Sequence, residues 1–404
     1  MKINIFKGKT LLGFILITLT SLAILSLASI LLVNLLYKPD YGDNVRQYFD
    51  DDLLLKASNY NRVSLNISIA SRFLSWFIMS GIIIIFFKYF KSTPINILLA
   101  FSYIVLFYLL IQLILLPLAY FRGYIIEHRF GLSNQTIAMW FSDYLKENGI
   151  SILISSLGIT GIYTLMVYIP KYWWIISSAV LAIFVVAATY LYPILIDPLF
   201  YKFEKLKDTN FQEQIINITG KASIEVKEVL VADASRKTNK ANAYFTGIGG
   251  SKRIVVFDNI INNFSRKEAL NVIAHEIGHW HYWHIVKSII IGIISGTAGL
   301  FLINAVFTYS SMVGDFKSIL VIILLISIIS FLSLPLQNAV SRTFERQADN
   351  FTMQATENPD AQIQLMLKLA ESNLSNVSPH WYIKYFLYSH PPIMERVEAA
   401  KNFD

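Results

Sequence analysis

The stretch Ala274-His275-Glu276-Ile277-Gly278-His279-Trp280 holds an H-E-x-x-H sequence within a helical pattern. Residues four apart lie on one face of an α-helix, so His275 and His279 can direct both imidazole rings at one metal ion. A catalytic zinc ion has three protein ligands and a water molecule, whose pKa it lowers to about 7. Glu276 follows the first histidine and can take that water's proton as general base. Only 7 histidines occur in 404 residues, so the pattern is a specific signal.

The residues before this motif begin its helix. Ser265 and Glu268 have the spacing of a capping box, in which each side chain accepts a hydrogen bond from the backbone of the other. The motif therefore lies about two turns inside a helix. The alternative is a pair of surface histidines on an amphipathic helix, which we favour less.

The composition is that of a membrane protein. Apolar residues make up 55% of the chain and aromatic residues 14%, which is too apolar for a soluble globular protein. There is no cysteine, so any metal must be held by histidine and carboxylate. The net charge of +7 contains no basic run, which suits anionic lipid headgroups better than nucleic acid.

Seven stretches are apolar enough to span a bilayer, which takes about 20 helical residues. They lie near residues 10–36, 64–87, 95–120, 150–169, 172–192, 286–308 and 318–338. We expect a mainly α protein with five spans in 1–192, two in 286–338, and one discontinuous polar domain formed by 193–285 and 339–404. That domain should contain strands at Lys227–Val231, Ala241–Gly247 and Arg253–Phe257. An amphipathic helix is expected over Asn134–Glu147.

The third metal ligand does not follow directly after the motif. The extended pattern H-E-x-x-H-x-x-G-x-x-H needs glycine at 282 and histidine at 285, where this sequence has Tyr282 and Ile285. His281 and His284 lie two and five residues beyond His279 and should turn away from its face. We therefore expect both to be interface or second-site residues.

Glu345 is the better candidate for the third ligand. The motif helix leads into the span near 286–308, and the next span leads into Phe344-Glu345-Arg346-Gln347-Ala348-Asp349. Because two spans are an even number of crossings, both polar ends emerge on the same side, where Glu345 can reach the histidines. Asp349, one turn further on, can accept a hydrogen bond from a ligand histidine. The alternative is a solvated helix in which these carboxylates pair with Arg342 and Arg346.

A helix boundary near the end of the chain supplies further candidates. In Ser389-His390-Pro391-Pro392 the prolines end one helix and begin the next, so the ring of His390 can face a cleft. Peptide hydrolysis needs a donor to the oxyanion besides the metal, and His390 or Arg396 can supply it. Taken alone, His390 is better explained as part of a surface turn.

Over most of its length the chain resembles the type I CaaX prenyl protease family, the Ste24-type integral membrane zinc metalloproteases of the M48 class. The motifs that carry the resemblance are His275-Glu276-Ile277-Gly278-His279, Phe344 to Asp349, Asn242-Ala243-Tyr244-Phe245, Ser389 to Pro392 with Glu395-Arg396, Glu127 to Thr136, and Asp197-Pro198-Leu199-Phe200.

This resemblance implies a chamber of seven transmembrane helices and a gluzincin-like zinc metalloprotease domain with a small β-sheet. It implies removal of the last three residues after a prenylated cysteine, with one zinc ion per chain. By the same likeness, His275, His279 and Glu345 bind zinc, Glu276 is the base, Asn242, Ala243 and Tyr244 hold the substrate backbone, and His390 with Arg396 assist near the scissile carbonyl.

Lys and Arg are divided evenly between the loops on the two sides of the membrane, so the positive-inside rule does not give the orientation of the chain. The resemblance places the zinc domain on the cytoplasmic side. The lack of cysteine and the richness in Ile, Lys and Asn indicate a bacterial inner membrane, or the ER membrane if the source is eukaryotic.

The loop near 309–317 is short, and the end soon after Arg396 argues against a C-terminal retrieval signal. The expected partners are membrane lipids and a lipidated or membrane-embedded peptide or protein.

Two other interpretations stay open. Shorter membrane proteases of the quality-control type share the zinc motif but lack most of the 120–200 region, so we rank them second. A non-enzymatic transporter or receptor with seven spans is disfavoured, because the chain has few charges in mid-span and no internal repeat.

Overall fold

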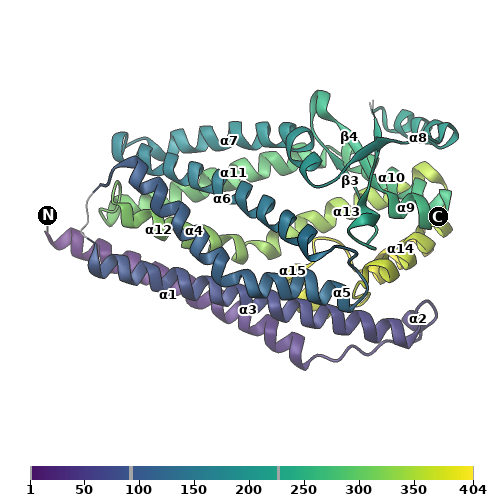
Figure 1. The fold of residues 1–404 in the computed structure, drawn as a ribbon, viewed down its shortest axis with the longest axis horizontal. Helices are drawn as coiled ribbons and strands as arrows, with labels where there is room; N and C mark the ends of the chain where they lie inside the picture. The colour runs from purple at the N-terminus through teal and green to yellow at the C-terminus, as the bar shows by residue number, and fades with distance from the viewer. Residues whose placement is uncertain (1, 91–93, 225–227, 404) are drawn as a thin grey trace.

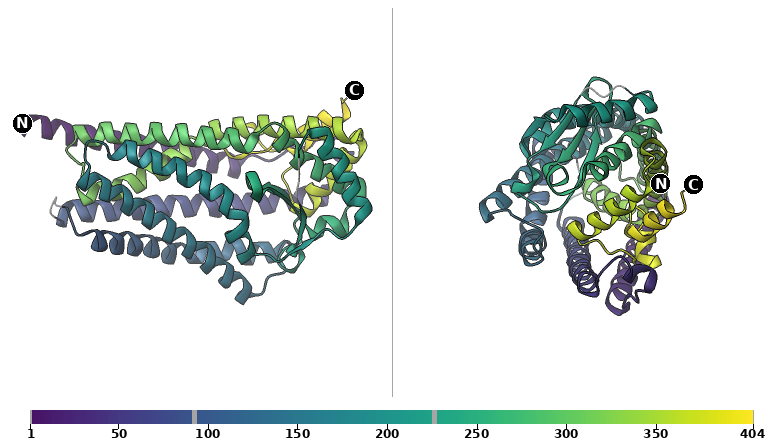
Figure 2. Two further views of the ribbon diagram at one scale, coloured as in Figure 1. Left: turned by 90° about the horizontal axis from the view of Figure 1, so that it is seen from above. Right: turned by 90° about the vertical axis from the view of Figure 1, so that its right-hand side faces the viewer.

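The computed structural model describes residues 2–90, 94–224 and 228–403. Long helices run along the molecule, and a small sheet with shorter helices gathers at the end that holds the C-terminus (Figure 1). Viewed from above, the two termini lie at opposite ends (Figure 2). The fold is therefore a helical bundle with a polar domain at one end.

The bundle contains the predicted membrane spans. Its long helices are α1 (Lys2–Leu36), α3 (Asp51–Tyr89), α4 (Ile97–Tyr120), α6 (Ile137–Tyr168), α7 (Trp173–Leu191) and α11 (His284–Tyr309), with shorter pieces α2 (Asp43–Arg46), η1 (Phe121–Ile126), α5 (Glu127–Arg129), η2 (Tyr192–Ile196) and η3 (Asp197–Leu199) between them. In the described chain, six helices are long and apolar enough to cross a membrane, or seven if the bent pair α12 (Phe316–Leu332) and α13 (Leu334–Thr356) forms one span. The seven predicted spans correspond to these elements.

Two details of the bundle differ from the sequence-based expectation. The amphipathic helix expected over Asn134–Glu147 and the fourth span form one continuous helix, α6. The seventh span is interrupted at Ser333, where α12 and α13 meet at 48°. Pro335 explains the break, because it lacks an N–H and disfavours helical geometry in the residue before it.

The polar domain is built on a four-stranded sheet in the order β1-β2-β4-β3. The strands are β1 (Phe203–Lys205), β2 (Val229–Ala232), β3 (Ala243–Thr246) and β4 (Arg253–Phe257); β2 and β4 are parallel and the other pairs antiparallel. The three predicted strands are confirmed, although Lys227 lies outside the described residues. Strand β1 was not predicted, because three residues are too few to show a strand pattern.

The remaining helices cover this sheet and connect it to the bundle. They are α8 (Thr209–Ala222), α9 (Asp258–Asn263), α10 (Arg266–His281), α14 (Pro359–Asn373), α15 (Trp381–Leu387) and α16 (Ile393–Lys401), with 3-10 turns η4 (Ala234–Arg236) and η5 (Gly249–Ser251). The division of the domain into 193–285 and 339–404 stays a prediction.

Helix α10 is the centre of the polar domain. It packs against α13, α14, α8 and β3, and its side chains Ile273, Ala274 and Ile277 are completely buried. The predicted capping box is confirmed, since the backbone N–H of Ser265 donates to Oε2 of Glu268 at 2.6 Å. Burial on all sides holds this helix rigidly, which suits a site that needs fixed geometry.

Helices α10 and α13 approach each other closely at Gly278. A Cβ atom added there would lie 3.0 Å from Cα and 3.2 Å from the carbonyl oxygen of Ala348 on α13. Only a residue without a side chain lets the two backbones come this near. The contact brings the middle of α13 against the motif face of α10.

Candidate metal centre

Helix α10 presents its two motif histidines on one face. Their Nε2 atoms are 3.2 Å apart. Two imidazole nitrogens at this distance must share a proton or face a common cation, because two N–H groups would collide.

Helix α13 brings Glu345 to the same point. Its Oε2 lies 3.1 Å from Nε2 of His275, and its Oε1 lies 3.4 Å from Nε2 of His279. One ligand atom from each of these three residues lies within 4.8 Å of the others. A tetrahedral ion with bonds of about 2.0–2.1 Å separates its ligand atoms by about 3.3 Å. The three residues therefore fit a metal of the size and geometry of zinc.

The charge around this point also fits a divalent cation. Three carboxyl groups, Glu276, Glu345 and Asp349, meet one guanidinium, Arg396, so the group carries a net negative charge when the histidines are neutral. Burial lowers the pKa of His275, but Asp349 and Glu345 more than reverse this and raise it to about 10. The site therefore favours positive charge, which a metal ion would supply in place of the proton.

Asp349 lies next to the ring nitrogen of His275 that faces away from the metal position. Its Oδ1 lies 3.0 Å from the buried Nδ1 of His275, which has no other partner among the described residues. Arg396 donates to both oxygens of Asp349, from Nε at 2.8 Å and from Nη2 at 2.6 Å. This two-bonded contact fixes the carboxylate. With its Nδ1 proton directed at Asp349, His275 keeps the lone pair of Nε2 for a metal.

His284 contacts His279, the second motif histidine. This corrects the expectation that His284 turns away from the site. Its Nδ1 lies 2.9 Å from Nδ1 of His279, and its Nε2 lies 2.8 Å from Oε1 of Gln347. The expectation assumed one continuous helix. In the structure Trp283 has φ +58, so α10 ends before α11 begins and His284 turns back toward the motif. His281 does lie away from the site, with its Nδ1 3.2 Å from the carbonyl oxygen of Ala222.

Glu276 lies between the histidines and the sheet. Its Oε2 accepts a hydrogen bond from the backbone N–H of Phe245 at 3.0 Å. Burial is the largest influence on this carboxyl and raises its pKa to about 7. A pKa near the operating pH suits a group that both accepts and returns a proton.

Strand β3 offers a free edge beside Glu276. It is the last strand of the sheet. The carbonyl of Asn242 accepts from the N–H of Phe257 on β4 at 3.0 Å, so the alternate residues Ala243 and Phe245 direct their backbone groups away from β4. Phe245 uses its N–H on Glu276, and Ala243 faces the cavity beside it.

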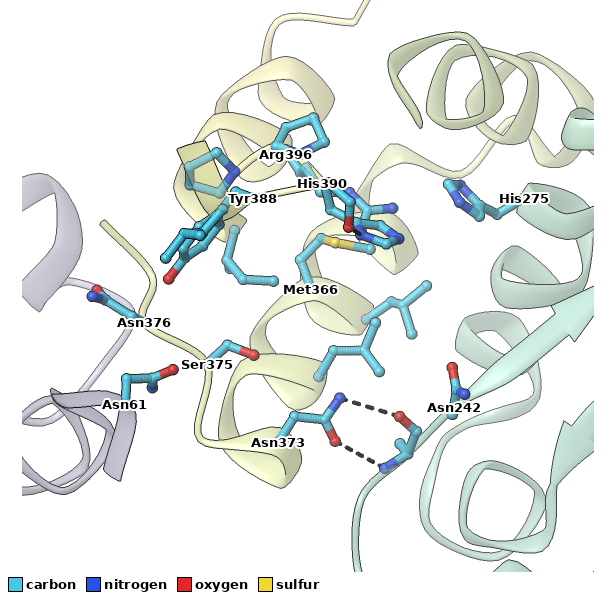
Figure 3. A pocket seen from close by; sticks show the side chains of 18 of the residues that line it. Asn61, Asn242, His275, Met366, Asn373, Ser375, Asn376, Tyr388, His390 and Arg396 are labelled. Atoms are coloured by element: carbon cyan, nitrogen blue, oxygen red, sulfur yellow. Dashed lines mark hydrogen bonds between the residues drawn. The ribbon is translucent and has the colours of Figure 1, made fainter. Parts of the chain in front are cut away.

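A cavity of about 670 Å³ opens onto this centre (Figure 3). Its lining includes His275, Glu276, Asn242, His390 and Arg396. Nε2 of His390 lies 3.3 Å from Oε1 of Glu345, and 59% of its side chain is exposed. His390 therefore lies in the gap between α15 and α16 with its ring toward the cavity, as the prolines indicated.

The structure brings together every predicted site residue except Tyr244. The hydroxyl of Tyr244 donates to Oδ2 of Asp197 at 3.2 Å, on the side of β3 away from the metal centre. Arg396 reaches the cavity, but its guanidinium is bound to Asp349. Two important residues were missed: His284, and Gly278, whose role depends on the position of α13.

A buried His-His-Glu group beside a carboxylate base, at the end of a bundle of membrane helices, defines a membrane-integral metallopeptidase. Residues 205–404 match the model of peptidase family M48, and residues 32–202 match that of the CAAX prenyl protease N-terminal region with five membrane helices. The chain belongs to peptidase family M48 and is of the Ste24 type.

Individual relatives agree with this assignment. An uncharacterized metalloprotease of Bacillus subtilis is 31% identical over 77% of this chain and 75% of its own length. A CAAX prenyl protease 1 homolog of rice is 34% identical over 72% of this chain and 70% of its own. The crystal structure of Ste24p from S. mikatae has the same fold, with a TM-score of 0.78 and 23% identity over 97% of this chain and 98% of that one.

The chain is therefore a multi-pass membrane metalloendopeptidase that acts on a peptide or protein substrate. The interpretation as a non-enzymatic transporter or receptor is wrong. The match over 32–202 covers the region that shorter quality-control proteases lack, so the Ste24 type is favoured over that alternative.

Proposed function

We propose that this protein is a zinc endopeptidase that cleaves close to the C-terminus of peptides held at the membrane, with prenylated CaaX sequences as the model substrate. The observation that carries the proposal is the group of His275, His279 and Glu345 beside Glu276, in a cavity that extends to the membrane helices. Residues of α3 and η1 line that cavity together with the histidine motif. A substrate anchored in the lipid would therefore reach the site along the bundle.

The metal ligands in this proposal are His275, His279 and Glu345. When bound, zinc would polarise the scissile carbonyl and lower the pKa of a water molecule. The site offers two nitrogens and one carboxylate, a ligand set typical of catalytic zinc.

Glu276 carries the proton in this mechanism. Its carboxylate accepts the proton of the attacking water and then donates it to the leaving amine nitrogen. The backbone N–H of Phe245 keeps the carboxylate in position throughout. The charge is conserved, because Glu276 ends the cycle ionised as it began.

The free edge of β3 receives the substrate backbone. The backbone groups of Ala243 have no partner among the described residues, which suits a peptide that adds to the sheet as a further strand. The side chain of Asn242 lies in the same cavity (Figure 3). His390 can donate to the oxyanion from the opposite wall. Arg396 acts indirectly: it positions Asp349, and its guanidinium adds positive charge near the site. We propose a cytoplasmic position for this domain in a bacterial inner membrane, or in the ER membrane of a eukaryote.

The decisive experiment is cleavage of a farnesylated CaaX peptide by the purified protein. We expect release of the C-terminal tripeptide, loss of activity with a chelator, and loss of activity in Glu276→Gln with the zinc retained. If Glu276→Gln cleaves as fast as the parent while holding zinc, the base is assigned wrongly. An unlipidated membrane protein serves as the second substrate, and its preferential cleavage would favour the quality-control type.

A further inference from the structure

A second cavity lies among the membrane helices next to the metal centre. It has a volume of about 1180 Å³ and is lined by residues of α3, α4, η1, α6 and neighbouring segments. Ser68 and Arg122 line both this cavity and the one that holds His275 and Glu276. The two spaces therefore adjoin at these residues.

Two arginines in this lining have no carboxylate partner among the described residues. Arg122 donates from Nε to Oγ of Ser64 at 3.1 Å, and the guanidinium of Arg72 lies over the ring of Phe331, 5.4 Å from its centroid. Both side chains are exposed to the cavity rather than packed in the core. A charged group inside a span is costly, so an unpaired one marks a place where an anion binds.

The other charges of the cavity are arranged differently. Lys237 pairs with Asp143 at 2.5 Å, Glu127 pairs with Lys240 at 2.7 Å, and Asp197 lies 3.5 Å from Arg253. These groups are paired by charge, although the buried Nε and Nη2 atoms of Arg253 make no hydrogen bond among the described residues.

The fourth carboxylate in the lining is Glu147, on α6. It forms no ion pair with either arginine among the described residues. Along the face of α3 that carries Arg72, Ser68, Ser71 and Ser75 add a polar lining. The arginine side of the cavity is thus positive and lined by polar side chains, and the paired charges belong to other residues of the lining.

We propose that Arg122 binds the C-terminal carboxylate of the peptide substrate, and that Arg72, about 12 Å further along α3 than the Ser64 partner of Arg122, adds positive charge to this subsite. This inference rests on the proposed function, cleavage close to a C-terminus. A tripeptide beyond the scissile bond spans about 10 Å when extended, and Arg122 lies in the same cavity as the base Glu276. Guanidinium binds carboxylate through two parallel hydrogen bonds, which a neutral terminus cannot match. The arginines would then select the bond to be cut by its distance from the chain end.

The test compares two CaaX-type peptides that differ only in a free C-terminal carboxylate or a C-terminal amide. The full chain is assayed in nanodiscs of zwitterionic lipid. We expect the parent to cleave the acid with a kcat/KM about tenfold or more above that of the amide, since bonds to charged groups are worth about 1.5–3 kcal/mol. Arg122→Gln and Arg72→Gln should each lower the value for the acid and leave that for the amide unchanged. Arg129→Gln is the matched control, because Arg129 is exposed and lines neither cavity.

Binding to the Glu276→Gln protein separates this subsite from the proposed function. Fluorescence anisotropy should show the acid peptide binding about tenfold more tightly than the amide, and Arg122→Gln in the same background should abolish the difference. This readout applies even if neither peptide is cleaved. Equal binding and equal cleavage of acid and amide by the parent would overturn the subsite while leaving the peptidase intact. Anionic lipid could instead inhibit the parent but not Arg122→Gln, with no preference for the acid peptide in either protein. That result would assign the arginines to a lipid headgroup and would also overturn the carboxylate subsite.

Discussion

Nδ1 of His279 lies 2.9 Å from Nδ1 of His284, and Nε2 of His284 lies 2.8 Å from the side-chain oxygen of Gln347. This arrangement determines where the protons lie. If Gln347 accepts from Nε2–H of His284, then Nδ1 of His284 is the acceptor and His279 donates from its own Nδ1. His279 must then direct the unprotonated Nε2 at the metal position. Two residues, His284 on α11 and Gln347 on α13, therefore orient the candidate ligand His279 on α10.

We predict that His284→Ala lowers zinc affinity by about ten- to a hundredfold, the usual effect of removing a partner of a ligand histidine. Competition with a fluorescent chelator measures it. His281→Ala is the matched control, since His281 contacts the backbone of Ala222 and lies away from the site. Equal losses of affinity in the two variants would show that His284 acts only through general packing.

We predict that Gly278→Ala separates α10 from α13. The new methyl group would lie 3.0 Å from the backbone of Ala348, so one helix must shift, at a cost of about 1–3 kcal/mol. Because Glu345 lies one turn before Ala348, zinc affinity should fall together with Tm. Gly292→Ala is the control, as an added Cβ there meets nothing within 4 Å. A normal zinc affinity in Gly278→Ala would mean that the helix spacing does not set the ligand geometry.

The sequence was sufficient to predict which three residues meet at the candidate metal centre, because each inference used a local or countable property. The spacing of His275 and His279 follows from helix geometry, and Glu345 followed from counting two spans between it and the motif. His284 was missed because its position depends on one backbone angle, φ +58 at Trp283, in a residue type that rarely adopts it.

Features that depend on the meeting of distant segments could not be predicted. The bend at Ser333 changes the direction of α13, and the cavity lined by Arg72 and Arg122 is formed by helices that are far apart in the sequence. In the sequence, Arg72 is only a charge within an apolar stretch. That Arg72 has no carboxylate partner among the described residues becomes visible only when its neighbours are known.

We predict that Arg396 and Asp349 are strongly coupled in stability. Arg396→Met leaves the buried Asp349 carboxylate without its two-bonded partner, and breaking such a pair costs about 3–5 kcal/mol. The double variant Arg396→Met with Asp349→Asn removes both charges and should recover part of the lost Tm. Additive losses in the double variant would contradict the coupling. Arg346→Met is the control, because its contact with Glu395 is long, at 3.7 Å, and exposed.

We predict that metal removal destabilises the protein in a way that depends on His275. Without a metal ion, the carboxylates Glu276, Glu345 and Asp349 are balanced only by Arg396 and by the proton that His275 then carries, since its pKa is raised to about 10. A bound ion stabilises the folded state by about 4 kcal/mol when its free concentration is a thousand times the dissociation constant. A chelator should therefore lower the Tm of the parent, and zinc should restore it. Magnesium should not, because it prefers six oxygen ligands. In His275→Ala the chelator should leave Tm unchanged, and an equal fall in that variant would place the stabilising metal elsewhere.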